Sequence, residues 1–125
     1  MIETTGVVHF TIPVSDIDRS ETFYHDILGL ETISRAPEPF NLLFMKSGED
    51  IVVLAKSKTP INPNPGDERF VHHAFGVPLD KYEESRAHLE EMGVHIIHEE
   101  DRQDGVFQGK QAHFHDPDRN VLEII

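Results

Sequence analysis

Residues 8–16 read Val-His-Phe-Thr-Ile-Pro-Val-Ser-Asp, and residues 71–80 repeat the pattern as Val-His-His-Ala-Phe-Gly-Val-Pro-Leu-Asp. In each copy a histidine, His9 or His72, stands five positions before a valine. In both copies apolar residues recur at every second position, as in a β-strand. Each copy then leads into a helical pattern that ends at a glycine. The repeat predicts a duplicated unit in which these two histidines occupy equivalent places.

The first copy opens a unit that we expect to contain one helix and four strands. Ser15 has the chemistry of a helix N-cap, and a helical stripe of apolar residues runs from there to Gly29. Turn-forming residues separate three further strands, which we expect at residues 30–36, 40–46 and 51–56. The first unit is therefore predicted to have the order βαβββ.

The second copy predicts a unit of the same order. Asp80 is its expected helix cap, and strands are expected at residues 94–99, 111–115 and 121–125, with a loop at residues 100–110. A proline-rich stretch without apolar periodicity separates the two units. We therefore expect one α+β domain over residues 1–125, with a first module at about 5–57, a linker at about 58–69 and a second module at about 70–125.

Composition narrows the class of partner. The chain carries a formal net charge of −12, has no cysteine and contains no long apolar run. Nucleic acid and membranes are therefore not expected as partners, because phosphate backbones attract clustered Lys and Arg and a membrane span needs an apolar helix. The N-terminus lacks the basic and apolar segments of a secretory signal, so a cytoplasmic protein is expected. Any metal site must use His, Asp and Glu, since thiolates are lacking.

Strand parity selects the polar residues that face away from the packing side. In the first lead strand the apolar residues occupy even positions, so His9 and Thr11 project from the opposite face. His72 in the second lead strand and Glu123 in the final strand also face away from their apolar neighbours. Two imidazoles and one carboxylate form a triad that binds a divalent metal and leaves further positions open for water or substrate.

These residues stand in motifs that resemble the vicinal oxygen chelate superfamily, which contains glyoxalases, bleomycin and fosfomycin resistance proteins and extradiol dioxygenases. The similar stretches are residues 9–16 with 23–24 and 28–30, residues 72–77, and residues 114–118 with 122–123. The resemblance implies two modules that form a curved, cup-shaped mixed sheet around a divalent metal. It places the metal ligands at His9, His72 and Glu123, and it implies a homodimer in which some ligands come from the partner chain.

One position departs from glyoxalase I, which carries a fourth ligand, a carboxylate, on the last strand of the first module. Aligning residues 45–53 with residues 115–123 places Val53 there. Isomerase chemistry is therefore disfavoured, because its acid–base pair would lack one carboxylate. The first module is expected to present an apolar cavity wall made of Leu43, Met45, Ile51 and Val53.

The second module is expected to present a polar wall, with Gln111, His113 and His115 beside Glu123. Besides Glu123, the candidate catalytic residues are His113 or His115, for proton transfer, and Thr11, for a hydrogen bond to substrate. His113 stands where fosfomycin-modifying enzymes carry a tyrosine. The basic residues that could attract an anionic substrate are Arg102, Lys110 and Arg119.

Three functions are compatible with the sequence. The first hypothesis is an extradiol-type ring-cleaving dioxygenase that acts on a small molecule and uses Fe²⁺ or Mn²⁺. Zn²⁺ or Ni²⁺ would instead fit lyase or isomerase chemistry. The alternatives are a fosfomycin-type thiol transferase or hydrolase and a metal-free drug-binding resistance protein. The metal content of the purified protein would separate these hypotheses most directly.

Overall fold

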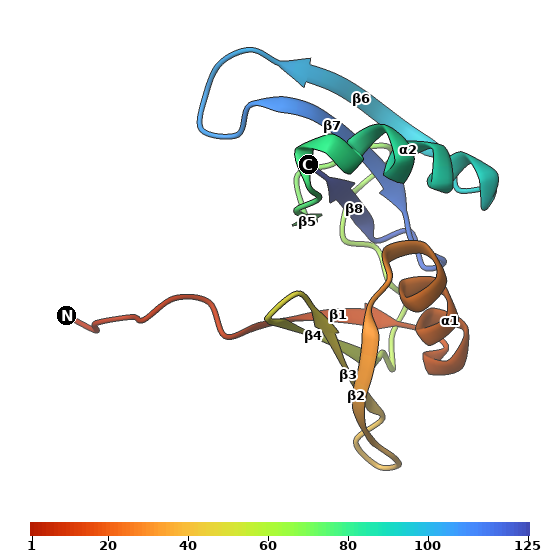
Figure 1. Cartoon of the computed structure of the whole chain (residues 1–125). Coiled ribbons are helices and arrows are strands. Elements are labelled where there is room, and N and C mark those ends of the chain that lie inside the picture. The colour runs from red at the N-terminus through yellow and green to blue at the C-terminus, as the bar shows by residue number, and fades with distance from the viewer. The chain divides into compact units, whose positions relative to one another are not determined.

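Two four-stranded mixed sheets, each with one α-helix, make up the computed structural model, which describes residues 1–125. The chain divides into two units, unit 1 (Met1–Ile61) and unit 2 (Asn62–Ile125), and each follows the order βαβββ (Figure 1). The predicted α+β class with two βαβββ modules is therefore confirmed. That both modules together form one domain stays a prediction.

The sheet of unit 1 has the strand order β1-β4-β3-β2, in which only the pair β1 and β4 is parallel. Figure 1 shows β1 and β4 side by side, with α1 following directly from β1. The elements are β1 His9–Val14, α1 Ile17–Leu28, β2 Glu31–Ala36, β3 Leu42–Ser47 and β4 Asp50–Lys56.

Helix α1 is capped one residue later than the sequence suggested. Asp16 is the N-cap, because its Oδ1 accepts a hydrogen bond of 3.0 Å from the backbone N–H of Arg19. Ser15 instead accepts a hydrogen bond of 2.8 Å from the Arg19 guanidinium. The predicted end at Gly29 is confirmed: this residue has a φ of 70° and its backbone N–H bonds to the carbonyl of His25.

The buried face of the unit 1 sheet carries Leu43 and Met45. Leu43 stands opposite Leu54 on β4, and all three side chains are fully buried. Directly opposed residues project from the same face, so Phe44 and Val53, which pair with each other, share the other face. The prediction that Leu43 and Met45 lie on the same wall as Val53 is therefore wrong. Every residue in this part of β3 is apolar, so the sequence carried no alternation from which to read parity.

The sheet of unit 2 repeats this plan with the order β5-β8-β7-β6, and its parallel pair is β5 and β8. Its buried face carries Ala112, Phe114 and Leu122. The elements are β5 His72–Phe75, a 3₁₀ helix Leu79–Lys81, α2 Tyr82–Glu91, β6 Ile96–Arg102, β7 Gly109–His115 and β8 Val121–Ile124.

Two element boundaries in unit 2 differ from the sequence prediction. Asp80 does not cap α2, because it lies within the 3₁₀ helix Leu79–Lys81, and no side chain caps the α-helix that begins at Tyr82. Strand β6 runs to Arg102, so the loop is shorter than the predicted range 100–110. The added strand residues bring charged side chains of β6 beside β7.

The register of the parallel pairs shows that the lead strands of the two units correspond. In unit 1, Val53 stands opposite Thr11, the second residue after His9. In unit 2, Glu123 stands opposite the second residue after His72. The predicted equivalence of His9 and His72 is confirmed, and a valine occupies the place of Glu123 in unit 1.

The following hairpins differ in length by one residue. Phe44 pairs with Val53, and His113 pairs with the glutamate that corresponds to Val53, so Phe44 and His113 are equivalent. The alignment that matched Met45 with His115 is therefore wrong by one residue, although it placed Val53 correctly. The longer hairpin of unit 2 is closed by a side-chain network in which Asp116 accepts hydrogen bonds from the turn.

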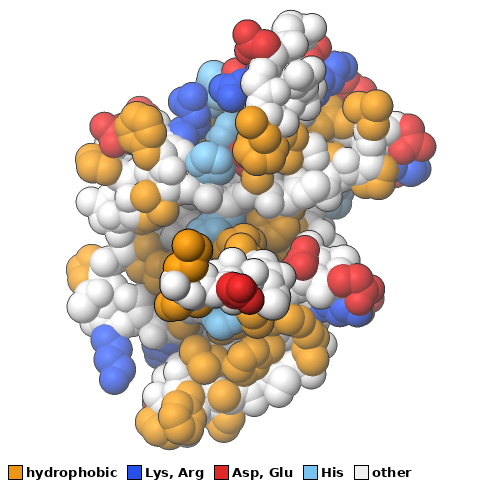
Figure 2. Space-filling model, turned by 90° about the vertical axis from the view of Figure 1, so that its left-hand side faces the viewer, with side chains coloured by type: hydrophobic (Ala, Val, Ile, Leu, Met, Phe, Trp, Pro, Cys, Tyr) orange, Lys and Arg blue, Asp and Glu red, His pale blue; other side chains and the backbone are white.

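The surface mixes both signs of charge. In the face drawn in Figure 2, acidic and basic side chains are interspersed among apolar ones, and histidines also reach the surface. No helix is long and apolar enough to cross a membrane.

Candidate metal centre

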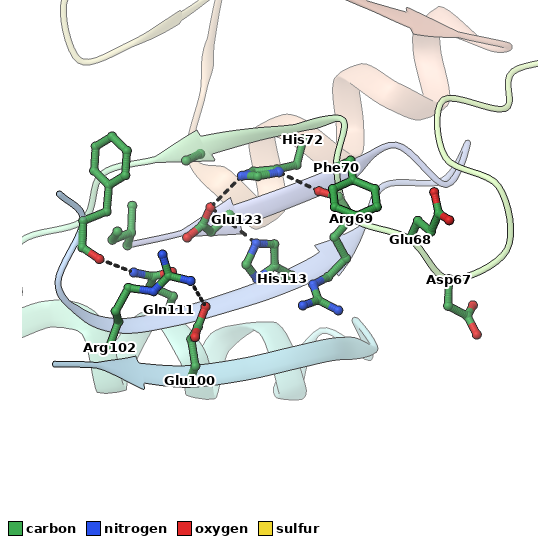
Figure 3. Close-up of a pocket in the computed structure, with 13 residues that line it drawn as sticks. Asp67, Glu68, Arg69, Phe70, His72, Glu100, Arg102, Gln111, His113 and Glu123 are labelled. Atoms are coloured by element: carbon green, nitrogen blue, oxygen red, sulfur yellow. Dashed lines mark hydrogen bonds and ion pairs between the residues drawn. The ribbon is translucent and has the colours of Figure 1, made fainter. Parts of the chain in front are cut away.

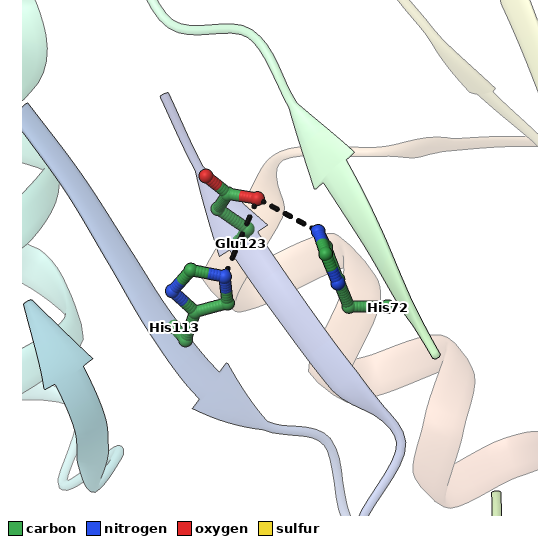
Figure 4. Close-up of side chains that lie close together, drawn as sticks. All are labelled: His72, His113 and Glu123. Carbon is green, nitrogen blue, oxygen red and sulfur yellow. Dashed lines mark ion pairs between the residues drawn. The ribbon is translucent and has the colours of Figure 1, made fainter. Parts of the chain in front are cut away.

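Three strands of unit 2 bring His72, His113 and Glu123 together. His113 on β7 is directly opposite Glu123 on β8, and β5, which carries His72, lies along the other edge of β8. Figure 4 shows the two imidazoles on either side of the carboxylate, each pointing toward it. The cluster therefore follows from strand order and register, because the central strand carries the acid and its two neighbours carry the bases.

The donor atoms of this cluster lie at close range. Nε2 of His72 is 3.1 Å and Nε2 of His113 is 3.4 Å from the same oxygen, Oε2 of Glu123. One donor atom from each residue can be chosen so that all three lie within 4.8 Å of one another. Two imidazole nitrogens and one carboxylate oxygen form the donor set that suits first-row divalent metals. The residues present therefore fit a metal ion.

A backbone carbonyl orients the His72 ring. Nδ1 of His72 lies 2.7 Å from the carbonyl oxygen of Arg69, so the proton must reside on Nδ1, which donates to that oxygen. Nε2, the other ring nitrogen, faces Glu123 and would offer its lone pair to a metal bound there. Metal-binding histidines characteristically donate their second N–H in this way, which fixes both the tautomer and the ring orientation.

The environment keeps His113 neutral. Its side chain is only 8% exposed. Burial, with further contributions from the positive charges of His72 and Arg69, lowers the pKa of His113 to about 4. Its Nδ1 is buried and has no hydrogen-bond partner. A neutral imidazole can bind a metal or exchange a hydrogen bond with a substrate.

Burial also shifts the pKa of Glu123, the carboxylic acid of the cluster. The Glu123 side chain is 6% exposed, and this burial raises the pKa of its carboxyl group, while the neighbouring His72 opposes the shift. A buried carboxylate is costly unless it is paired with a positive group. A bound cation would remove that cost, which favours the metal interpretation of the cluster.

The cluster opens into a cavity of about 980 Å³, which is large enough for a small-molecule substrate. Figure 3 shows His72, His113 and Glu123 on the strands, with Arg69 and Phe70 on the loop that precedes β5. Gln111 is held in the wall by a hydrogen bond of 2.9 Å from its Nε2 to the carbonyl of Phe107. The polar wall predicted for the second module is present in Gln111, His113 and Glu123.

The remaining predicted residues lie elsewhere. His115 faces a neighbouring cavity, which it shares with His95 and Arg119, and it does not line the cavity of the cluster. Its pKa is lowered, chiefly by burial. His9 and Thr11 are exposed on β1 of unit 1, so their approach to the cluster in unit 2 stays a prediction.

Sequence reasoning missed the contribution of Arg69. This residue lies in the predicted linker, in which the sequence singled out no individual residue. Its carbonyl orients His72 and its side chain lines the cavity. The only available signal was proximity in sequence, since Arg69 stands three residues before His72.

Two known proteins are similar to nearly the whole of this chain. The chain is 30% identical to glutathione transferase FosA from Serratia marcescens, over 93% of this chain and 77% of that protein. It is also 30% identical to Glyoxylase I 4 from Arabidopsis thaliana, over 98% of this chain and 71% of that protein.

A solved structure of a FosX variant from Listeria monocytogenes, a fosfomycin resistance protein, superposes with a TM-score of 0.77 at 19% identity. The match covers 98% of this chain and 90% of that one. That structure was solved in complex with Mn(II) and 1S,2S-dihydroxypropylphosphonic acid. At this identity the likeness shows a shared fold.

The family model agrees with both comparisons. Its match runs over residues 6–124 and so includes both βαβββ units and every residue of the cluster. The chain belongs to the Glyoxalase/Bleomycin resistance protein/Dioxygenase superfamily.

Proposed function

We propose that this chain is a divalent-metal-dependent enzyme of the fosfomycin-resistance type, which opens the epoxide of a small phosphonate with a thiol or with water. The observation that carries the proposal is the 3.1 Å approach of His72 Nε2 to Glu123 Oε2, with the other His72 nitrogen already engaged. Similarity to FosA over 93% of the chain supports the choice of chemistry.

The metal would be held by His72 and Glu123 of unit 2, with His9 as the third ligand. His9 is supported by its register position, which is equivalent to that of His72, and by its exposure on β1. A bound divalent cation supplies positive charge that polarises an oxygen of the substrate. Mn²⁺ is the first choice, because FosX was crystallised with Mn(II).

His113 would contact the substrate beside the metal. Its neutral imidazole lies next to Glu123 and lines the cavity, so it can hydrogen-bond an oxygen of the substrate or exchange a proton there. The buried position limits water around this group. Thr11, on β1 of unit 1, is the second candidate for a hydrogen bond to substrate.

The alternative functions receive less support. The relatives named above are a glutathione transferase, a protein named as a glyoxylase and a fosfomycin resistance protein, so ring cleavage of a catechol gains no support from them. Isomerase chemistry has the likeness to Glyoxylase I 4 in its favour. Val53, however, occupies the place of Glu123 in unit 1, so the second carboxylate is missing. A metal-free binding protein would leave the buried Glu123 without a cation.

Phosphorus NMR of fosfomycin incubated with the Mn²⁺-loaded protein tests the proposal. A new phosphonate resonance that appears only with glutathione indicates a thiol transferase, and one that appears without glutathione indicates a hydrolase. Glu123→Gln should abolish turnover, whereas His25→Asn, a change at an exposed histidine of α1, should not. Fosfomycin that stays unchanged under both conditions, in protein that has bound Mn²⁺, would overturn the proposal.

We also propose a homodimer in which the third ligand, His9, comes from the partner chain. The proposal is supported by the family resemblance and by the exposure of His9 and Phe10 on β1. A subunit-mixing experiment that tests it is described in the Discussion.

A further inference from the structure

Side-chain hydrogen bonds connect the two ends of the loop before β5. The side chain of Asn64 is buried and makes two hydrogen bonds with the backbone of Val71, at 2.8 Å to the carbonyl and 2.9 Å from the N–H. The two bonds have the pattern of those between paired residues in a β-sheet, and they join residue 64 to residue 71 across the loop. The His72 side chain adds a third bond by donating to the carbonyl of Arg69. Arg69 is therefore positioned by bonds on both sides of it.

The side chain of Arg69 contains a buried hydrogen-bond donor without a partner. Its Nε is buried and has no hydrogen-bond partner, and its guanidinium forms no ion pair. Buried polar groups in proteins are nearly always paired, so such an exception calls for a partner. Figure 3 shows the Arg69 side chain extending from the loop toward His113, within the lining of the cavity.

The other three basic residues considered each have a carboxylate within ion-pair distance. The guanidinium of Arg102 lies 3.3 Å from a carboxylate oxygen of Glu100, and that of Arg119 lies 3.8 Å from one of Asp67. Lys110 pairs with a carboxylate in the same way, that of Glu83.

Arg69 therefore differs from the three residues to which the sequence pointed. In a chain with a net charge of −12, an arginine that lines a cavity and lacks a carboxylate partner is available to an incoming anion.

We propose that the guanidinium of Arg69 binds the anionic oxygen group of the substrate, a phosphonate, beside His72 and His113. The inference rests on the proposed function for the reaction and adds the residue that recognises the charged end of the substrate. Guanidinium groups hold tetrahedral oxyanions by paired N–H···O bonds, which a single ammonium group cannot reproduce. The carbonyl and the side chain of Arg69 would thus serve one site, the first by orienting His72 and the second by binding substrate.

Calorimetric titration with inorganic phosphate and with fosfomycin tests this assignment. Arg69→Gln should weaken the binding of both anions by about 10- to 100-fold, the range expected for lost charge-assisted hydrogen bonds. Arg69→Lys should lose less affinity, since it keeps the charge. Arg35→Gln is the matched control and should bind as the wild type does, because this guanidinium is paired with Asp18 and Glu21 in unit 1 and does not line the cluster cavity.

The titrations should be made with Mn²⁺-loaded and with EDTA-treated protein. Phosphate binding to the EDTA-treated protein needs no metal and no turnover, so failure of the proposed function would leave this measurement valid. Arg69→Gln should bind Mn²⁺ as tightly as the wild type, because the substitution keeps the backbone carbonyl that orients His72. Unchanged anion affinity in a folded Arg69→Gln protein, or a wild type that binds neither anion, would overturn the assignment.

Discussion

Nε2 of His72 lies 3.1 Å from Oε2 of Glu123, although the two residues belong to strands at opposite ends of the second module in sequence. The parallel pairing of β5 with β8 makes this contact possible, since it brings the first strand of the module beside the last. The same pairing in unit 1 brings His9 near Val53, where no carboxylate is available. Unit 2 therefore carries the acid of the proposed metal centre.

We expect His113 to be needed for turnover of the substrate but not for binding of the metal. His113→Gln should retain Mn²⁺ at the wild-type stoichiometry and reduce the rate of fosfomycin turnover by about 10²- to 10⁴-fold, the range of general acid–base effects. Metal analysis and phosphorus NMR on the same preparation measure both quantities. Loss of Mn²⁺ in this variant would instead make His113 the third ligand in place of His9.

Mixing two inactive variants tests whether the ligands come from two chains. His9→Ala and Glu123→Gln should each be inactive alone, because each lacks one ligand. If His9 of one chain completes the site of another, mixed dimers contain one intact site, and refolding the two variants together should restore about a quarter of the wild-type activity. Absence of recovery, in a mixture shown to exchange subunits, would place all ligands within one chain.

Asn64 is expected to stabilise the fold through the loop that carries Arg69. Asn64→Ala removes both part-buried hydrogen bonds to Val71 and should lower the free energy of unfolding by about 1–3 kcal/mol, because each lost bond contributes roughly 0.5–1.5 kcal/mol. Urea denaturation followed by circular dichroism measures the change. Asn62→Ala, at an exposed position of the same segment, is the control and should change stability by less than about 0.5 kcal/mol. Equal stability of the two variants would contradict this role.

Phe114 is expected to be the most costly single truncation in unit 2. The side chain is fully buried on the face opposite the metal cluster, so Phe114→Ala should destabilise the protein by about 3–5 kcal/mol. Phe40→Ala, at a residue that is 70% exposed, should cost less than about 0.5 kcal/mol. Thermal unfolding of both variants gives the comparison, and a mild effect at Phe114 would mean that the core of unit 2 is less well packed than described.

The repeated lead strand made most of the fold predictable. Alternation over residues 8–14 and 71–77 located both lead strands, and the matching positions of His9 and His72 within the repeat predicted the equivalence that the register confirms. Glu123 was selected because it is the single polar residue in the apolar last strand, where it stands between Leu122 and Ile124. Where alternation is present, the face of each residue can be read from the sequence.

Prediction failed where that signal was weak or where the contact was tertiary. The apolar run in β3 hid the orientation of Leu43 and Met45. Ser15, the predicted cap, and its neighbour Asp16 have chemically similar side chains, so only the backbone geometry decides between them. Arg69 escaped notice because its importance depends on a carbonyl bond to His72 and on the absence of a carboxylate partner. Neither property is encoded in a local pattern.

The affinity of the protein for Mn²⁺, measured by electron paramagnetic resonance on wild type and on Glu123→Gln, tests the central claim most directly. We expect the wild type to bind one Mn²⁺ per predicted site and the variant to lose at least about tenfold in affinity, since a carboxylate ligand is replaced by a neutral amide. His25→Asn should bind as the wild type does. Equal Mn²⁺ affinity in wild type and Glu123→Gln would contradict a metal centre built on His72 and Glu123.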